Sequence, residues 1–148
     1  MTITTILEKL PYGESFLFVD TLEYIDEQKV TGSFTFRPEM DCYKGHFKTY
    51  PVTPGVLLTE VMAQIGLVCM GIYLTGGPAG LSFGLTSTHV EFMRPVLPGE
   101  KVTVTGEKIY FRFGKLKCRV TMINEQGETV SSGELAGMII GPDKIRNS

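Results

Sequence analysis

The sequence has few of the residues on which metal, redox and phosphate sites depend. It contains two histidines, three cysteines and no tryptophan. Cys42, Cys69 and Cys118 are odd in number and form no C-x-x-C pair, so we expect inert, reduced thiols rather than disulfides or a metal site. No segment matches the G-x-x-x-x-G-K-[ST] or G-x-G-x-x-G phosphate loops, and the sequence therefore predicts no nucleotide cofactor.

Positive charge is also limited. Fourteen basic residues face sixteen acidic ones, which leaves no basic excess to attract nucleic acid or an anionic membrane surface. Residues 1–9 lack the charged start and long apolar stretch of an export signal, so we expect a cytoplasmic protein. A chain of 148 residues with 43% hydrophobic content is predicted to form one domain over residues 1–148.

One long helix is predicted after Thr53. Threonine followed by proline is a typical helix start, in which the hydroxyl caps free amides. The helix should continue to about Leu74 and end at Gly76. Apolar side chains lie on every side of it, so other parts of the fold must surround it. Its length also suggests a membrane span, but Glu60 and Gln64 interrupt it and no basic cluster anchors its ends, so we expect none.

The remaining segments predict strands, turns and one irregular loop. Before the long helix we expect a short helix over 3–10, a strand over 16–19 and 22–25, and another over 31–37. After it we expect consecutive strands over 81–92, 101–111, 115–123 and 129–140. Residues 37–51 have no periodicity and collect Gly, Pro, Tyr, Lys and His, so functional side chains are expected there. Residues 141–148 are predicted to fray.

Two polar positions stand out as candidates for chemistry. Glu60 and Gln64 lie four residues apart, on one face of an otherwise apolar helix. A buried carboxyl group holds its proton more tightly and can act as a general acid; alternatively, Glu60 only complements the helix dipole. His46 lies in the irregular loop, where a single histidine is more often structural. Beside a carboxyl group and the amide of Gly55, it can remove a proton next to a carbonyl group.

These residues belong to two blocks that resemble one family. The first block runs from Gly45 to Gln64 and is similar to G-H-F-x-x-x-P-x-x-P-G-V-L-x-x-E-x-M-A-Q. The second spans 92–100 and is similar to F-x-R-P-V-x-P-G-D. Both are signatures of the beta-hydroxyacyl-[acyl-carrier-protein] dehydratases, and weaker similarity at 10–20 and 113–115 extends the resemblance over nearly the whole chain. The sequence departs from the family at Lys48-Thr49, where Pro-Gly is usual, and at Tyr12, where the family has histidine.

The resemblance implies an α+β hot-dog fold, in which a roughly six-stranded antiparallel sheet wraps a long central helix. It implies that a (3R)-hydroxyacyl thioester, carried on the phosphopantetheine of an acyl carrier protein, loses water to give a trans-2-enoyl thioester. No metal or cofactor is needed. By this resemblance His46 removes the α proton, Glu60 protonates or orients the departing hydroxyl group, and the Gly55 amide stabilises the thioester oxygen. Phe47 and Val56 would then contact substrate, and Gln64 would orient Glu60.

The resemblance also implies partners. The family forms homodimers, in some cases trimers of dimers, in which His46 of one chain would face Glu60 of the other. The acyl chain needs an apolar tunnel, for which the candidates are Phe83, Val90, Phe92, Met93, Ile65 and Met62, although a plain core role is the simpler expectation for each. Local positive charge for the acidic carrier protein is offered by Lys44, Lys48, Arg94, Arg112, Lys115, Lys117 and Arg119, although solvated strand faces explain most of these residues equally well. We expect His89, in a strand pattern, to be structural or on the surface.

Three alternatives stay open. A hot-dog acyl thioesterase shares the fold but uses a helix carboxylate with water and lacks the equivalent of His46. An R-specific enoyl-CoA hydratase differs only in preferring CoA to carrier-protein substrates. A catalytically silent subunit would hold acyl chains without reacting them, which the intact pair of His46 and Glu60 argues against.

Overall fold

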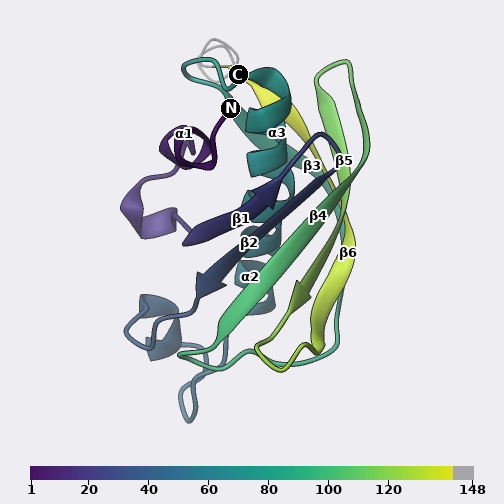
Figure 1. Ribbon diagram of the computed structural model, residues 1–148. Coiled ribbons are helices and arrows are strands. Elements are labelled where there is room, and N and C mark those ends of the chain that lie inside the picture. The colour runs from purple at the N-terminus through teal and green to yellow at the C-terminus, as the bar shows by residue number, and fades with distance from the viewer. Residues whose placement is uncertain (142–148) are drawn as a thin grey trace.

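The computed structural model describes residues 1–141, and six antiparallel strands form a single curved sheet in it (Figure 1). The order across the sheet is β1-β2-β4-β5-β6-β3. The strands are β1 Thr21–Ile25, β2 Lys29–Thr35, β3 Ser82–Phe92, β4 Lys101–Arg112, β5 Lys115–Ile123 and β6 Thr129–Ile140. A long helix lies against the concave face (Figure 1). This is the predicted hot-dog arrangement, and only Gly141 of the predicted frayed tail falls within the described residues.

The central helix is continuous but not uniform. It consists of α2 (Gly55–Ala63), a π-helical turn η3 (Gln64–Val68) and α3 (Cys69–Thr75). By length and composition alone this helix is apolar enough to cross a membrane, yet 72% of its most apolar window is buried inside the protein. The surrounding sheet therefore accounts for the apolar residues on every side of the helix.

The two ends of the central helix compare differently with the prediction. Gly76 ends it in the left-handed conformation, with φ of 80°, as its sequence predicts. The predicted threonine cap is wrong. Pro54 occupies the capping position and no side chain caps the helix, because the buried Thr53 hydroxyl instead pairs with the Tyr43 hydroxyl at 2.6 Å. The first-turn amides are thus left without a side-chain acceptor.

The segment before β1 is the other departure from the predicted elements. α1 spans Ile3–Glu8 and a 3-10 turn, η1, spans Glu14–Phe16, so residues 16–19 are not part of a strand. The reason is a distant partner: the Phe18 amide donates to Gln64 Oε1 at 2.8 Å instead of to a neighbouring strand. The predicted bounds of β5 and β6 coincide with the structure, and those of β2, β3 and β4 differ by two residues or fewer. The loop over 37–51 contains one further 3-10 turn, η2 (Asp41–Lys44).

Glycines allow the π-helical turn to lie directly on the sheet. A Cβ added at Gly106 of β4 would fall 2.7 Å from the Cα of Gly66, and one added at Gly66 would fall 2.7 Å from Cγ1 of Val120. Neither distance leaves room for a methyl group, and at Gly106 the obstacle is backbone, which cannot rotate away. The contact fixes the height of the helix over β4 and β5.

We expect Gly106→Ala to lower the free energy of unfolding by about 1–3 kcal/mol or more, because the added methyl group separates helix and sheet. Gly13→Ala is the matched control, since nothing lies within 4 Å of its added Cβ and its φ of −72° suits any residue. Urea denaturation of both variants measures the difference. Equal midpoints for Gly106→Ala and the wild type would contradict the close contact.

Candidate active site

His46 lies in the segment that joins β2 to α2, which extends beyond the end of the sheet (Figure 1). Its Nδ1 lies 2.8 Å from the carbonyl oxygen of Val52. Because a carbonyl oxygen can only accept, Nδ1 must carry a proton. In the neutral ring, Nε2 then keeps its lone pair, which is the form a general base requires.

The loop around His46 holds the imidazole from several sides. The ring of Phe47 stacks on it with a centroid distance of 3.9 Å, and the peptide bond between the two residues is cis. Tyr50 packs edge-on against Phe47. Two backbone hydrogen bonds close the loop, from Phe47 to Tyr50 and from Val52 to His46. The ring therefore has little freedom to turn.

Glu60 projects from the second turn of α2 and is fixed by Gln64. The Gln64 amide nitrogen donates to Glu60 Oε2 at 2.8 Å and to the carbonyl oxygen of Phe16 at 3.0 Å. With the bond from Phe18 to its oxygen, the fully buried Gln64 side chain satisfies both of its amide hydrogens. Gln64 thus holds one carboxyl oxygen of Glu60 in place. The four-residue spacing in the sequence predicts this contact.

Burial raises the pKa of Glu60 above its ordinary value, and the hydrogen bond from Gln64 partly opposes that rise. Desolvation acts on the charged form, whereas the amide hydrogen bond favours it. The net direction is upward, so the carboxyl group keeps its proton to higher pH than an exposed glutamate. Such a group can donate a proton.

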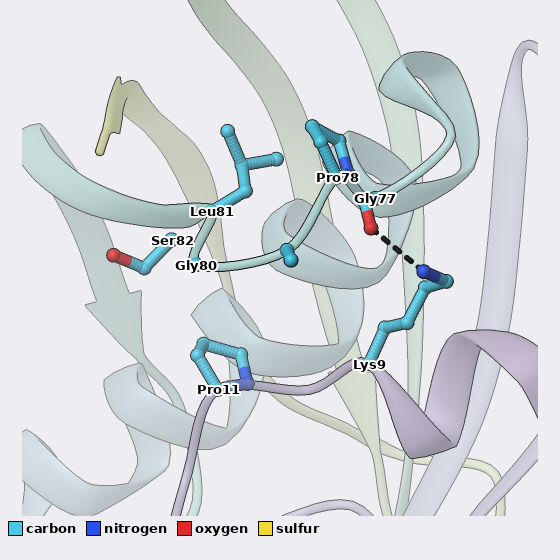
Figure 2. A pocket seen from close by; sticks show the side chains of 8 residues that line it. Lys9, Pro11, Gly77, Pro78, Gly80, Leu81 and Ser82 are labelled. Carbon is cyan, nitrogen blue, oxygen red and sulfur yellow. Dashed lines mark hydrogen bonds between the residues drawn. The ribbon is translucent and has the colours of Figure 1, made fainter. Parts of the chain in front are cut away.

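A cavity of about 380 Å³ lies away from this pair, beside the end of α3, and Figure 2 shows its lining. There the ammonium group of Lys9 donates to the carbonyl oxygen of Gly77 at 2.8 Å. Pro11, Pro78 and Leu81 form other parts of the wall. No acid and base meet in it, so we do not place the reaction there.

Glu60 opens into a different, mostly apolar cavity of about 280 Å³. Its lining comprises Tyr12, Phe16, Glu60, Ala63, Leu67, Val68, Phe83 and Leu85. The carboxyl group of Glu60 and the hydroxyl group of Tyr12 are the polar side-chain groups in this wall. An apolar pocket with few polar atoms suits an acyl chain that carries one reacting group.

A further cavity, of about 330 Å³, lies at the N-terminal end of α2. Its lining comprises Val52, Thr53, Gly55, Leu58, Phe92, Met93, Arg94 and Pro95. The two signature blocks meet here, because the Thr53 amide donates to the carbonyl oxygen of Val96 at 2.9 Å. The ring of Phe92 faces Gly55, since a Cβ added there would lie 3.4 Å from it, an ordinary contact distance. Through Val52, His46 is attached to this cavity.

Within residues 1–141 of a single chain, His46 and Glu60 share neither a hydrogen bond nor one of these cavities. The structure joins His46 to Val52, which lines the same cavity as Gly55, and brings Glu60 together with Gln64. Within this part of one chain, His46 therefore lacks a nearby acid and Glu60 lacks a nearby base. In the described part of the chain, no three His, Cys, Asp or Glu residues gather in a way that could hold a metal ion.

The other predicted site residues divide into three groups. Phe83 lines the Glu60 cavity, and Phe92 and Met93 line the Gly55 cavity. Met62 and Ile65 are fully buried core residues, which is the simpler of the two roles expected for them, and Val90 packs against the core. Val56 is 77% exposed and Phe47 is 47% exposed, so neither encloses substrate within one chain. The His89 side chain is exposed, as predicted.

One residue of the Glu60 cavity is not predicted as a site residue from the sequence. Tyr12 comes from the segment after α1 and lies across the cavity wall with Phe16, at a ring distance of 6.3 Å. Its only signal in the sequence is that it replaces the histidine of the family pattern. That departure proves to be located beside Glu60.

A model of the ApeI-like dehydratase family matches residues 22–134, which is more than half of the chain. The chain belongs to this family. It is also 36% identical to a 3-hydroxyacyl-[acyl-carrier-protein] dehydratase FabZ of Thermus thermophilus, over 95% of this chain and 99% of that one. A FabZ of Sinorhizobium medicae is 31% identical over 97% of this chain and 92% of its own length. Family membership makes the protein a dehydratase, as its sequence predicts.

Solved structures confirm the hot-dog fold. A thioesterase of Haemophilus influenzae superposes with a TM-score of 0.68 at 12% identity, over 95% of this chain and 92% of that one. A thioesterase superfamily member of T. thermophilus gives 0.64 at 19% identity, over 84% and 90%. At such low identity the likeness concerns the fold alone.

Gln64→Met should change the pH dependence of this dehydratase. Losing the hydrogen bond that lowers the pKa of Glu60 leaves desolvation unopposed, so the pKa rises further. Activity that requires protonated Glu60 is lost as pH rises through that pKa, so the alkaline limb of the profile should move to higher pH. Because the Phe18 amide and the Phe16 carbonyl oxygen lose their hydrogen-bond partner, we also expect about 1–3 kcal/mol less stability.

Dehydration rates measured across pH with a (3R)-hydroxyacyl thioester, alongside thermal melts, check both effects. Gln28→Met is the control, because the Gln28 side chain is exposed in the β1–β2 turn. An alkaline limb that stays in place in Gln64→Met would contradict the role of the amide.

Proposed function

We propose that the protein is a 3-hydroxyacyl-[acyl-carrier-protein] dehydratase, which removes water from a (3R)-hydroxyacyl thioester to give the trans-2-enoyl thioester. The proposal rests on two side chains with complementary roles, one suited to accept a proton and one suited to donate a proton. The bond from His46 Nδ1 to Val52 leaves Nε2 as the proton acceptor of the neutral ring, and burial in an apolar cavity raises the pKa of Glu60, which favours its protonated form. The names of the relatives support the same substrate class.

The reaction follows from these two protonation states. Nε2 of His46 takes the proton from the α carbon, and the electrons left behind form the new double bond. The bond between the β carbon and oxygen breaks, and Glu60 supplies the proton with which that oxygen leaves as water. The Gly55 amide donates to the thioester oxygen, where negative charge develops. Only protons move, so the proposed reaction needs no cofactor.

The active site requires a second copy of the chain in this proposal. Strand β3 pairs with β6 on one side only among the described strands, which leaves an edge eleven residues long. Long unpaired edges with apolar side chains such as the exposed Leu85 are usually covered. Pairing of two β3 edges forms a homodimer in which His46 of one protomer reaches the Glu60 cavity of its partner.

The hairpin between β4 and β5 is the proposed docking surface for the acidic carrier protein. Of the seven predicted basic residues, Lys44, Arg94, Lys117 and Arg119 form ion pairs with acidic neighbours. The guanidinium group of Arg112 lies over the Tyr110 ring at 4.3 Å, and Phe113 at the tip is 96% exposed. An exposed aromatic residue between Arg112 and Lys115 suits an acidic surface with an apolar centre. A cytoplasmic location is part of this proposal.

His46→Ala should reduce kcat by a factor of about 10²–10⁴, the usual share of a general base. Gln126→Ala is the control, because that exposed side chain lies in the β5–β6 turn, outside β3 and outside both cavities. The assay follows hydration of a crotonyl group carried on the acyl carrier protein and, in parallel, on CoA. Thermal melts show whether each variant remains folded.

The same assay separates the competing functions. Faster turnover of the carrier-bound substrate supports the proposal, whereas a preference for CoA favours an enoyl-CoA hydratase. Release of free thiol without hydration identifies a thioesterase. Wild-type turnover in folded His46→Ala would remove the histidine from the mechanism.

A further inference from the structure

Tyr12 shares the Glu60 cavity but has no part in the mechanism above. Its hydroxyl group makes no hydrogen bond to any residue in the described range 1–141, and the residue is half-buried. Burial, together with the nearby charge of Glu60, raises the pKa of Tyr12 well above its ordinary value. The hydroxyl group therefore keeps its proton at any pH at which the enzyme works, and it remains a hydrogen-bond donor.

The cavity has one other polar side chain, Glu60, and only half of that carboxyl group is engaged. Gln64 donates to Oε2, whereas Oε1 makes no hydrogen bond within the described residues. The rest of the wall is apolar. A ligand in this cavity therefore meets two available polar groups, the Tyr12 hydroxyl and the Glu60 carboxyl. Both suit one oxygen atom held at the boundary of an apolar chain.

We propose that the Tyr12 hydroxyl donates a hydrogen bond to the 3-oxygen of the substrate, the atom that leaves as water. The inference rests on the proposed function. As the bond between the β carbon and oxygen breaks, its electron pair moves to oxygen and Glu60 delivers the proton. Tyr12 keeps its own proton throughout and stabilises the negative charge that develops on oxygen before that transfer is complete.

The replacement of the family's histidine by Tyr12 can be explained by this role. The family has histidine where this chain has Tyr12, and a ring N–H can donate a hydrogen bond as a phenol can. The exchange keeps a donor at this position while it changes the length and shape of the side chain. Tyr12→His is therefore a conservative variant, and Tyr12→Phe removes the donor while keeping the ring that packs near Phe16.

We expect Tyr12→Phe to lower kcat by roughly tenfold to a hundredfold, with KM changed much less, because the lost bond acts mainly in the transition state. Tyr12→His should recover most of kcat. The measurement is the steady-state hydration of carrier-bound enoyl chains of four, eight and twelve carbons, with thermal melts of every variant. The loss should be similar for all three chains, since each has the same oxygen at the reacting carbon.

Four results would overturn the inference. Wild-type kcat in Tyr12→Phe shows that the hydroxyl group touches no reacting atom. Equal losses in the Phe and His variants, or a loss that depends on chain length, assign Tyr12 to packing of the wall. A wild-type protein that cannot hydrate any of the chains refutes the proposed function and this inference together, whereas an active wild type with an unaffected Tyr12→Phe refutes the inference alone.

Discussion

The side chain of Gln64 makes the connection on which both the fold and the site depend. It lies fully buried at the first position of the π-helical turn and bonds to the backbone of Phe16 and Phe18 as well as to Glu60. One amide thus attaches the N-terminal segment to the central helix and sets the direction of the carboxyl group. Because an unpaired amide in the interior is costly, each of these bonds requires the others.

The burial of the central helix explains where chemistry can occur. The sheet covers most of the helix, and two of the cavities in the described residues lie against its N-terminal turn at Gly55 and against its polar face at Glu60. His46 is bonded to Val52 in the wall of the first cavity, and Tyr12 lines the second. The thioesterases with the same fold show that this scaffold does not dictate the reaction. The choice of residues around these two openings does.

Much of the fold can be predicted from local sequence, and the predictions that are wrong have a common cause. The ends of β5 and β6 lie at Gly, Asn and Gln-rich turns, and the helix ends at Gly76, so short-range rules suffice there. The segment 16–19 and the Thr53 cap fail because their hydrogen-bond partners, Gln64 and Tyr43, are brought in by tertiary structure. A local sequence pattern cannot predict a hydrogen-bond partner that comes from a distant part of the chain.

The candidate site divides in the same way. The pairing of Glu60 with Gln64 is a property of one helix face and is readable from spacing. The proton position on His46 depends on the Val52 carbonyl group, and the place of Tyr12 depends on how the N-terminal segment crosses the helix. Both follow from the folded arrangement. The exposure of Val56 and Phe47 likewise becomes visible only in three dimensions.

The central claim is that one working site combines His46 of one protomer with Glu60 of its partner. Mixing the separately inactive His46→Ala and Glu60→Gln proteins, after unfolding and refolding them together, tests it directly. Mixed dimers carry one intact site and one doubly altered site, so equal amounts should restore about a quarter of wild-type activity by random pairing. Activity that stays at the level of the two separate variants, in a mixture shown to contain mixed dimers, would contradict the account.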